Sequence, residues 1–265
     1  MDLKFYEYGV ENDKTIVFLH ALGIGSFMWN NQIAYFKDRF HIIVPDFPGH
    51  GINNNLEWNS LEDTAQRILT IIQERAKGRK AHIIGESLGG GVALTMLLID
   101  PSLIDSAVIS GQSLERISGT IIMKTAALLM SPFLKTKFLL RGLAKASKID
   151  TGDIEGFISS IMKVKSSAFI KAFHNALDID LIQNISLIEN KVLLIAGEKE
   201  PKKMILSHCK AKHLNTNFES VLYPGMGHEW MTTNQDAFNK VIYYWLENRT
   251  VPEEFIANKK TLLNS

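Results

Sequence analysis

The chain has 265 residues, 46% of them hydrophobic and 22% charged, and its formal net charge is +1. This composition is typical of a folded, soluble protein, and the length suits one large domain or one domain with an insertion. Because the charge is balanced, the composition argues against a nucleic-acid-binding protein, which usually has an excess of Lys and Arg. No apolar stretch has the form of a secretion signal or reaches the roughly 20 residues of a membrane span. We therefore expect a cytoplasmic protein with no membrane anchor and no nucleic-acid partner.

Short apolar runs typical of β-strands alternate along the chain with longer segments of helical period. The runs occupy residues 15–20, 41–46, 81–85, 106–111, 191–197 and 218–223. Their apolar residues are consecutive rather than alternating, as in strands that helices cover on both faces. The pattern predicts an α/β fold with a mostly parallel sheet between layers of helices.

Two of the helical segments have clear boundaries. The first spans Ser60–Lys77, where Ser60 and Asp63 form a capping-box pattern at the start and Gly78 ends the helix. The second spans Gln235–Asn248, where apolar residues recur every three or four positions. It is expected to close the sheet at the C-terminus.

Residues 112–185 interrupt the alternation of strands and helices. They contain no convincing strand, only helix-like stretches rich in Met, Phe, Leu and Lys. A connection of this length in a compact domain is usually functional. We predict a helical cap over residues 112–185, inserted into a core made of residues 1–111 and 186–265.

One serine stands between two glycines in the stretch GESLG, residues 85–89, where a predicted strand gives way to a helix. Gly-x-Ser-x-Gly also occurs by chance, but in this context it is the nucleophile elbow. The serine of an elbow occupies a strained turn at a helix N-terminus, and the glycines allow the backbone to approach closely. Ser87 is therefore the candidate nucleophile.

A serine nucleophile needs a base and a group that orients the base. His228 lies in a glycine-rich loop between the last predicted strand and the last helix, as the chain order serine, acid, histidine requires. Two carboxylates follow the strand at residues 191–197. Glu200 is the first choice for the acid, and Glu198 is the reserve. Donors for the oxyanion are expected from the loop at residues 20–23 and from the N–H of Leu88.

Five motifs, in this order and spacing, resemble the α/β-hydrolase superfamily: HALG, DFPGHG, GESLGG, GEKEP and GMGHEW. Within the superfamily the chain is similar to small esterases and 3-oxoadipate enol-lactonases, which carry a helical cap where this chain has its insertion. The resemblance implies Ser87 as nucleophile, Glu200 as acid and His228 as base. The N–H groups of Leu22 and Leu88 are the implied oxyanion hole.

Two positions depart from the usual pattern of the family. Ala21 stands where glycine is most frequent, and Glu200 stands where aspartate is usual. A serine at position 87 argues against the haloalkane dehalogenases and epoxide hydrolases of this fold, which have aspartate there.

These residues predict a serine hydrolase of the carboxylesterase or lactonase type, acting on a small, largely apolar ester or lactone, without cofactor or metal, as a monomer or homodimer. Two alternatives stay open: a ligand-sensing protein of the same fold with slow turnover, and a carbon–carbon hydrolase or lyase that uses the same triad. Apolar side chains of the cap and the motif loops are candidates for lining the substrate pocket: Trp29, Met123, Met130, Phe133, Phe138, Phe157, Met162, Phe169 and Trp230.

Overall fold

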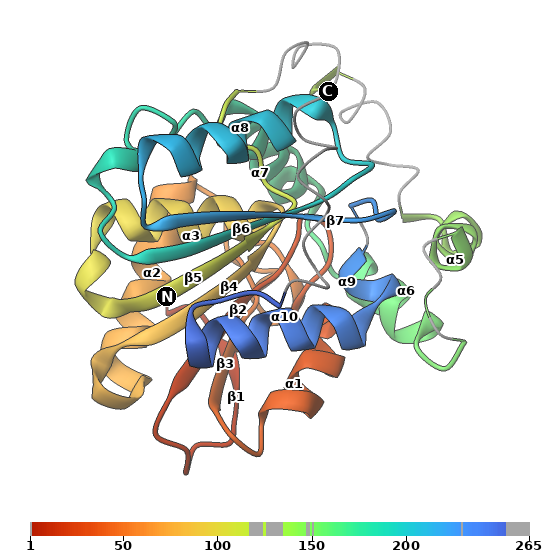
Figure 1. Ribbon diagram of the computed structural model, residues 1–265. Coiled ribbons are helices and arrows are strands. Elements are labelled where there is room, and N and C mark those ends of the chain that lie inside the picture. Colours follow the sequence, from red (N-terminus) through yellow and green to blue (C-terminus); the bar gives the residue numbers. More distant parts are fainter. Residues whose placement is uncertain are drawn as a thin grey trace.

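The computed structural model describes residues 2–116, 124–125, 135–146, 149, 151–228 and 230–252. Within these ranges the chain forms a seven-stranded sheet (Figure 1). Every neighbouring pair of strands is parallel except the first pair, β1 with β3. The predicted α/β fold is therefore confirmed. In their order across the sheet, the strands are β1 (Phe5–Tyr8), β3 (His41–Pro45), β2 (Thr15–Leu19), β4 (Ala81–Glu86), β5 (Ile104–Ser110), β6 (Lys191–Gly197) and β7 (Phe218–Tyr223).

Strand β1 is the element of the sheet that the sequence pattern missed. Its four residues are alternately half-buried and exposed, because it is an edge strand whose one neighbour is β3. All five residues of β3 are buried, and the strand appears in the sequence as a consecutive apolar run. Such runs mark strands covered on both faces, so a search for them does not find a half-covered edge strand.

Two layers of helices cover the sheet (Figure 1). One layer shares a core cluster with the sheet through α2, α3, α7 and α8, and the other through α1 and α10. None of the helices in the described ranges is long and apolar enough to cross a bilayer. The α-helices are α1 (Asn30–Phe36), α2 (Leu61–Arg75), α3 (Leu88–Ile99), α5 (Lys137–Ala146), α6 (Ile154–Met162), α7 (Ser166–Asp178), α8 (Lys202–Leu214), α9 (Trp230–Thr233) and α10 (Gln235–Asn248). Short 3-10 helices occupy Ser26–Trp29, Gly51–Asn53, Lys77–Arg79, Pro101–Leu103 and Ile185–Leu187.

The predicted boundaries of α2 and α10 agree closely with the structure. The Ser60 hydroxyl accepts a hydrogen bond from the N–H of Asp63 at 3.1 Å, which caps α2. The helix ends at Arg75, before the expected Lys77, because Ala76 is already extended. Helix α10 spans the predicted residues.

The described part of the insertion, residues 112–185, contains helices and no strand. Helices α5 and α6 form a small apolar cluster with Ile24 and Phe27 of the first motif loop. Helix α7 instead contributes Ala168 and Ala172 to the main core. The insertion therefore shares part of its packing with the sheet layers, and its division from the core at residues 112 and 185 stays a prediction.

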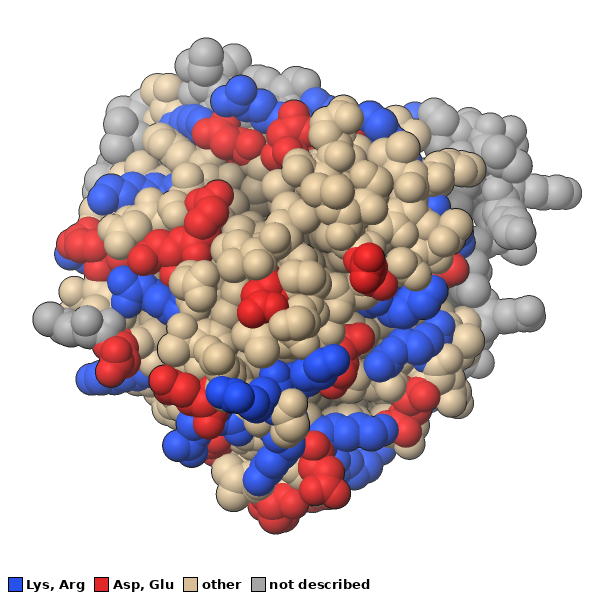
Figure 2. Space-filling view, turned by 90° about the vertical axis from the view of Figure 1, so that its left-hand side faces the viewer, with Lys and Arg blue, Asp and Glu red and all other residues tan. Residues whose placement is uncertain are grey.

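Charged side chains of both signs lie next to one another on the face shown in Figure 2. Ion pairs among the described residues include Arg67 with Asp63 at 2.9 Å and Lys14 with Glu247 at 3.1 Å. These pairs are partly exposed to solvent, so each adds little to stability.

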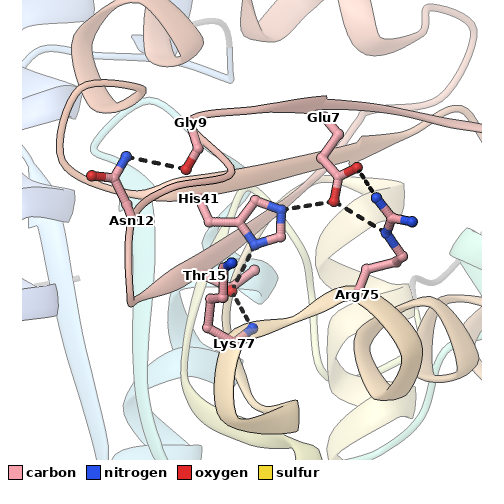
Figure 3. Close-up of polar contacts among 7 residues, drawn as sticks. All are labelled: Glu7, Gly9, Asn12, Thr15, His41, Arg75 and Lys77. Carbon is pink, nitrogen blue, oxygen red and sulfur yellow. Dashed lines mark hydrogen bonds and ion pairs between the residues drawn. The ribbon is translucent and has the colours of Figure 1, made fainter.

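A more buried polar network ties the edge strand β1 to the rest of the sheet (Figure 3). His41, only 1% exposed, lies 2.9 Å from the Glu7 carboxylate through Nε2 and 3.1 Å from the Thr15 hydroxyl through Nδ1. The N–H of Lys77 donates to the same hydroxyl at 3.0 Å. Arg75, at the end of α2, donates to both oxygens of Glu7. The network thus joins β1, β2, β3 and α2.

The Glu7→Gln variant is expected to be less stable than the wild type at pH 7 and equally stable in acid. Burial acts to raise the pKa of Glu7, but the hydrogen bonds and charges of Arg75 and His41 outweigh it and leave the pKa below its ordinary value. A lowered pKa gives stability above the pKa of the unfolded chain, about 4.3, and this stability is lost as pH falls through the folded-state pKa. Urea unfolding at several pH values measures the difference. Glu11→Gln, at an exposed position, is the control, and an equal loss for Glu7→Gln at pH 7 and in acid would contradict the assignment.

Candidate active site

Ser87 is the single residue between strand β4 and helix α3. Its backbone has φ 52° and ψ −115°, a conformation that is rare for residues other than glycine. Two hydrogen bonds hold it there: its N–H donates to the carbonyl of Ser110 at 2.8 Å, and its carbonyl accepts from the N–H of Gly91 at 3.1 Å. The serine therefore occupies a strained strand-to-helix turn at the carboxyl edge of the sheet.

The two glycines that flank the serine lie too close to backbone atoms to carry a side chain. A Cβ on Gly85 would lie 2.4 Å from the carbonyl oxygen of Gly89. A Cβ on Gly89 would lie 2.1 Å from the carbonyl oxygen of Leu19, at the end of β2. Gly89 thus packs directly against the end of the neighbouring strand and Gly85 against the start of α3, which explains why both positions are glycine.

His228 and Glu200 come from loops at the same edge of the sheet, after β7 and β6. The distance from His228 Nδ1 to Glu200 Oε1 is 2.9 Å. The Glu200 side chain is 3% exposed, whereas that of His228 is half-exposed. The reserve acid, Glu198, is exposed and accepts a hydrogen bond from the N–H of Gly225 instead. Of these two carboxylates, Glu200 is therefore the one that the fold brings to the histidine.

The structure also places both leucines whose N–H groups are the expected oxyanion donors. Leu88 is the first residue of α3, so its N–H belongs to the helix turn that has no intrahelical acceptors. Leu22 lies in the loop after β2 and lines a cavity, described below, together with His228. The N–H of the next residue, Gly23, donates to His50 Nε2 at 3.3 Å.

Two buried histidines support the loop that carries Leu22. His20 Nε2 accepts a hydrogen bond from the N–H of Phe47 at 2.8 Å, and His50 Nε2 accepts from Gly23. Each Nε2 must therefore carry a lone pair, which leaves Nδ1 as the protonated nitrogen. Burial lowers the pKa of both rings, that of His50 to about 3. Both rings are neutral, as their roles as acceptors require.

Asp46 joins the two motif loops beside these histidines. It is 1% exposed; its Oδ1 accepts from the N–H of Ser26 at 2.6 Å and its Oδ2 from the N–H of Ile52 at 2.8 Å. Both Asp46 and His50 belong to the motif DFPGHG, and the motif alone does not predict these supporting roles. The signal that could have identified them is their position directly after an apolar strand, in the loop at the carboxyl edge of the sheet.

A cavity of about 480 Å³ opens beside His228 and the Leu22 loop. Its lining is mostly apolar and combines loop residues with helices α5, α6 and α7 of the insertion, including Leu140, Phe157 and Phe169. Ser87 itself is partly buried and is not among the lining residues, although its neighbour Glu86 is. In the described ranges, no group of three or more His, Cys, Asp or Glu residues is arranged so that it could hold a metal ion.

Of the residues expected to line the pocket, Phe157 and Phe169 do so, and four others do not. Trp29 is fully buried in the core, with its ring 4.8 Å from that of Phe18. Trp230 is 1% exposed and donates through Nε1 to the Ser110 hydroxyl at 3.1 Å. Phe138 and Met162 point to solvent, with exposed fractions of 81% and 36%. The remaining three lie outside the described residues: Met123, Met130 and Phe133.

Glu86, the residue before the candidate nucleophile, is a buried carboxyl for which the sequence motif predicts no role. It is 2% exposed, and neither oxygen has a hydrogen-bond partner among the described residues. Burial raises its pKa from the ordinary value to about 7, against the opposing charge of His228. The hydroxyl of Ser110 also favours the ionised form, but its geometry is not that of a hydrogen bond.

Known proteins share both sequence and fold with this chain. The family described as alpha/beta hydrolase fold matches residues 14–142. A 3-oxoadipate enol-lactonase of Acinetobacter baylyi is 35% identical over 86 residues, 32% of this chain and 32% of that protein. The (E)-2-((N-methylformamido)methylene)succinate hydrolase of the same organism is 21% identical over 92% of this chain and 93% of its own length. The enol-lactonase structure from Burkholderia xenovorans LB400 superimposes with a TM-score of 0.78 at 16% identity, over 92% of this chain and 96% of that chain.

Proposed function

Because the chain belongs to the α/β-hydrolase superfamily, we propose that it is a serine hydrolase that cleaves a small, largely apolar carboxylic ester or lactone through an acyl-enzyme on Ser87. The observation that carries the proposal is the hydrogen bond of 2.9 Å between His228 and Glu200, at the sheet edge where the elbow holds the serine. A carboxylate only accepts hydrogen bonds, so Nδ1 of His228 carries a proton, and in the neutral ring Nε2 is the basic nitrogen. The ring of His228 is half-exposed, whereas the Glu200 carboxylate behind it is buried.

The reaction follows from these positions. His228 Nε2 takes the proton of the Ser87 hydroxyl as Oγ attacks the carbonyl carbon of the substrate. The N–H groups of Leu22 and Leu88 stabilise the oxyanion, and each such donor is typically worth about 3 kcal/mol in the transition state. The imidazolium then protonates the leaving alkoxide, and water cleaves the acyl-enzyme by the same path.

The cavity supports an apolar substrate. Its wall is formed largely by aliphatic and aromatic side chains, and its volume of about 480 Å³ is in the range of small-ligand sites. Polar side chains also line the cavity, among them Glu86, His228, Lys135 and Asp153. The helices α5, α6 and α7 act as the cap that closes this space. An enol-lactonase and a succinate-derivative hydrolase among the relatives are named for comparable reactions, cleavage of a lactone and hydrolysis of a small molecule.

Labelling with a fluorophosphonate tests the nucleophile without knowledge of the substrate. The wild type is expected to gain the mass of a single adduct, and Ser87→Ala is expected to gain none, because only an activated serine attacks the probe. A matched pair identifies the acid: Glu200→Gln should slow labelling strongly, and Glu198→Gln should not. Intact-mass spectrometry measures both.

Two outcomes would contradict the proposal. An adduct that persists in Ser87→Ala would place the reactive group elsewhere. A folded wild type that gains no adduct would favour the ligand-sensing alternative. With the nucleophile established, product analysis on esters, lactones and carbon–carbon bonded substrates separates the hydrolase from the lyase reading.

A further inference from the structure

Glu86 lies beside His228 but is outside the proposed triad. A Cβ on Gly111 would lie 2.7 Å from Glu86 Oε1 and 2.9 Å from His228 Cε1. The carboxyl and the imidazole therefore contact the same glycine and lie within about 6 Å of each other, the range over which one charge changes the protonation of another. Gly111 has φ 64°, so its backbone and its lack of a side chain both favour this arrangement.

The surroundings of Glu86 offer little other stabilisation for a negative charge. Neither carboxyl oxygen has a hydrogen-bond partner among the described residues, and the side chain is buried at the wall of the cavity. The hydroxyl of Ser110, which accepts the indole N–H of Trp230, also favours the ionised form of Glu86, but its geometry is not that of a hydrogen bond. A buried carboxyl left in this state is costly unless a positive charge forms near it.

Two other titratable groups act on Glu86 through their charge. His228 favours its ionised form, and Glu200, on the loop after β6, disfavours it. Lys135 and Asp153 of the insertion also line the cavity. A positive charge forms beside Glu86 when His228 becomes an imidazolium, which happens twice in the proposed reaction.

We infer that Glu86 is a second carboxyl that acts on His228, a positioning residue whose ionised form stabilises the imidazolium while Glu200 orients the ring. The inference rests on the proposed function for its role in turnover. Glu86 exchanges no proton with the substrate in this scheme: the proton moves from the Ser87 hydroxyl to His228 Nε2 and then to the leaving group. The active form combines a neutral His228 with an ionised Glu86, and the two groups titrate as a coupled pair.

Nuclear magnetic resonance of the resting protein tests the coupling without any substrate. In Glu86→Gln the pKa of the His228 ring should fall by about one unit, because an opposite charge is lost. Glu219→Gln is the control: it removes a carboxylate of β7 that pairs with Lys212, and it should leave the pKa of His228 unchanged. An unchanged His228 titration in Glu86→Gln overturns the inference. Since this measurement needs no turnover, it distinguishes failure of the inference from failure of the proposed function.

A second measurement covers the case in which Glu86→Gln does not fold. In wild-type protein with labelled glutamate, the Glu86 carboxyl carbon should show an inflection at the pH where His228 titrates, and a titration without it overturns the coupling.

Turnover gives the third readout, through the acid limb of the pH profile. Because two coupled protons must be lost, log kcat/KM of the wild type should rise with a slope that exceeds one and approaches two. Glu86→Gln should rise with a slope of one. A structural role alone would lower the rate at every pH and leave the slope as in the wild type, and that result would overturn the inference.

Discussion

His228→Ala is expected to lower kcat on an activated ester by a factor of about 10⁴ to 10⁶, because the variant has no base for Ser87 and no acid for the leaving group. KM should change little, since the apolar walls of the cavity remain. Steady-state kinetics from pH 6 to 9 measures the loss. Circular dichroism should show that the variant keeps the wild-type fold, because the half-exposed ring of His228 contributes little packing.

His213→Ala is the matched control for this experiment. His213 is exposed near the end of α8 and has no part in the site, so the variant should keep the wild-type rate. A His228→Ala protein that retains more than about a tenth of the wild-type kcat would remove His228 from the mechanism.

Gly89→Ala should cause the largest loss of stability among the substitutions discussed, about 3 kcal/mol or more. The added methyl would lie 2.1 Å from the Leu19 carbonyl oxygen and 2.9 Å from that of His20. Both are backbone atoms, one at the end of β2 and one in the loop that follows it, and they cannot move aside as a flexible side chain would. The turn that holds Ser87 should be displaced with the strand, so fluorophosphonate labelling should also fail. Urea unfolding measures the stability.

Gly142→Ala provides the control for the added methyl group. Nothing lies within 4 Å of a Cβ at this exposed position of α5. Alanine favours a helix over glycine by about 1 kcal/mol, so this variant should be as stable as the wild type or slightly more stable. If Gly89→Ala were as stable as the wild type, the backbone around Ser87 would have to accommodate the methyl group, and the prediction would be wrong.

The buried strands were predictable from the sequence because of where they lie. All residues of β6 except Lys191 are buried, and the apolar run KVLLIAG predicts this burial. The edge strand β1 was not predictable in this way, since its side chains face water at every second position. Chain order alone brought Glu200 and His228 together as candidates, because parallel strands carry their following loops to one edge of the sheet.

The lining of the cavity was less predictable. Trp29 and Phe157 are both large apolar side chains in segments near the motifs, yet one fills the core and the other faces the cavity. Size and hydrophobicity favour burial of either kind, and the choice depends on the direction of each side chain in the folded protein. The burial of Glu86 was not predictable for a related reason: it follows from the place of this residue at the end of the fully buried strand β4.

The pair of histidines under the Leu22 loop sets a limit on how this protein responds to its medium. An imidazole that has taken up a second proton has no lone pair, so protonating His50 would release the N–H of Gly23 and place a charge in the core. The hydrogen bonds that support the Leu22 loop should therefore not change with pH as long as the protein stays folded. Engineering of the working pH must therefore target the groups around His228, on the loops after β6 and β7 and at the end of β4, and not the two histidines under the Leu22 loop.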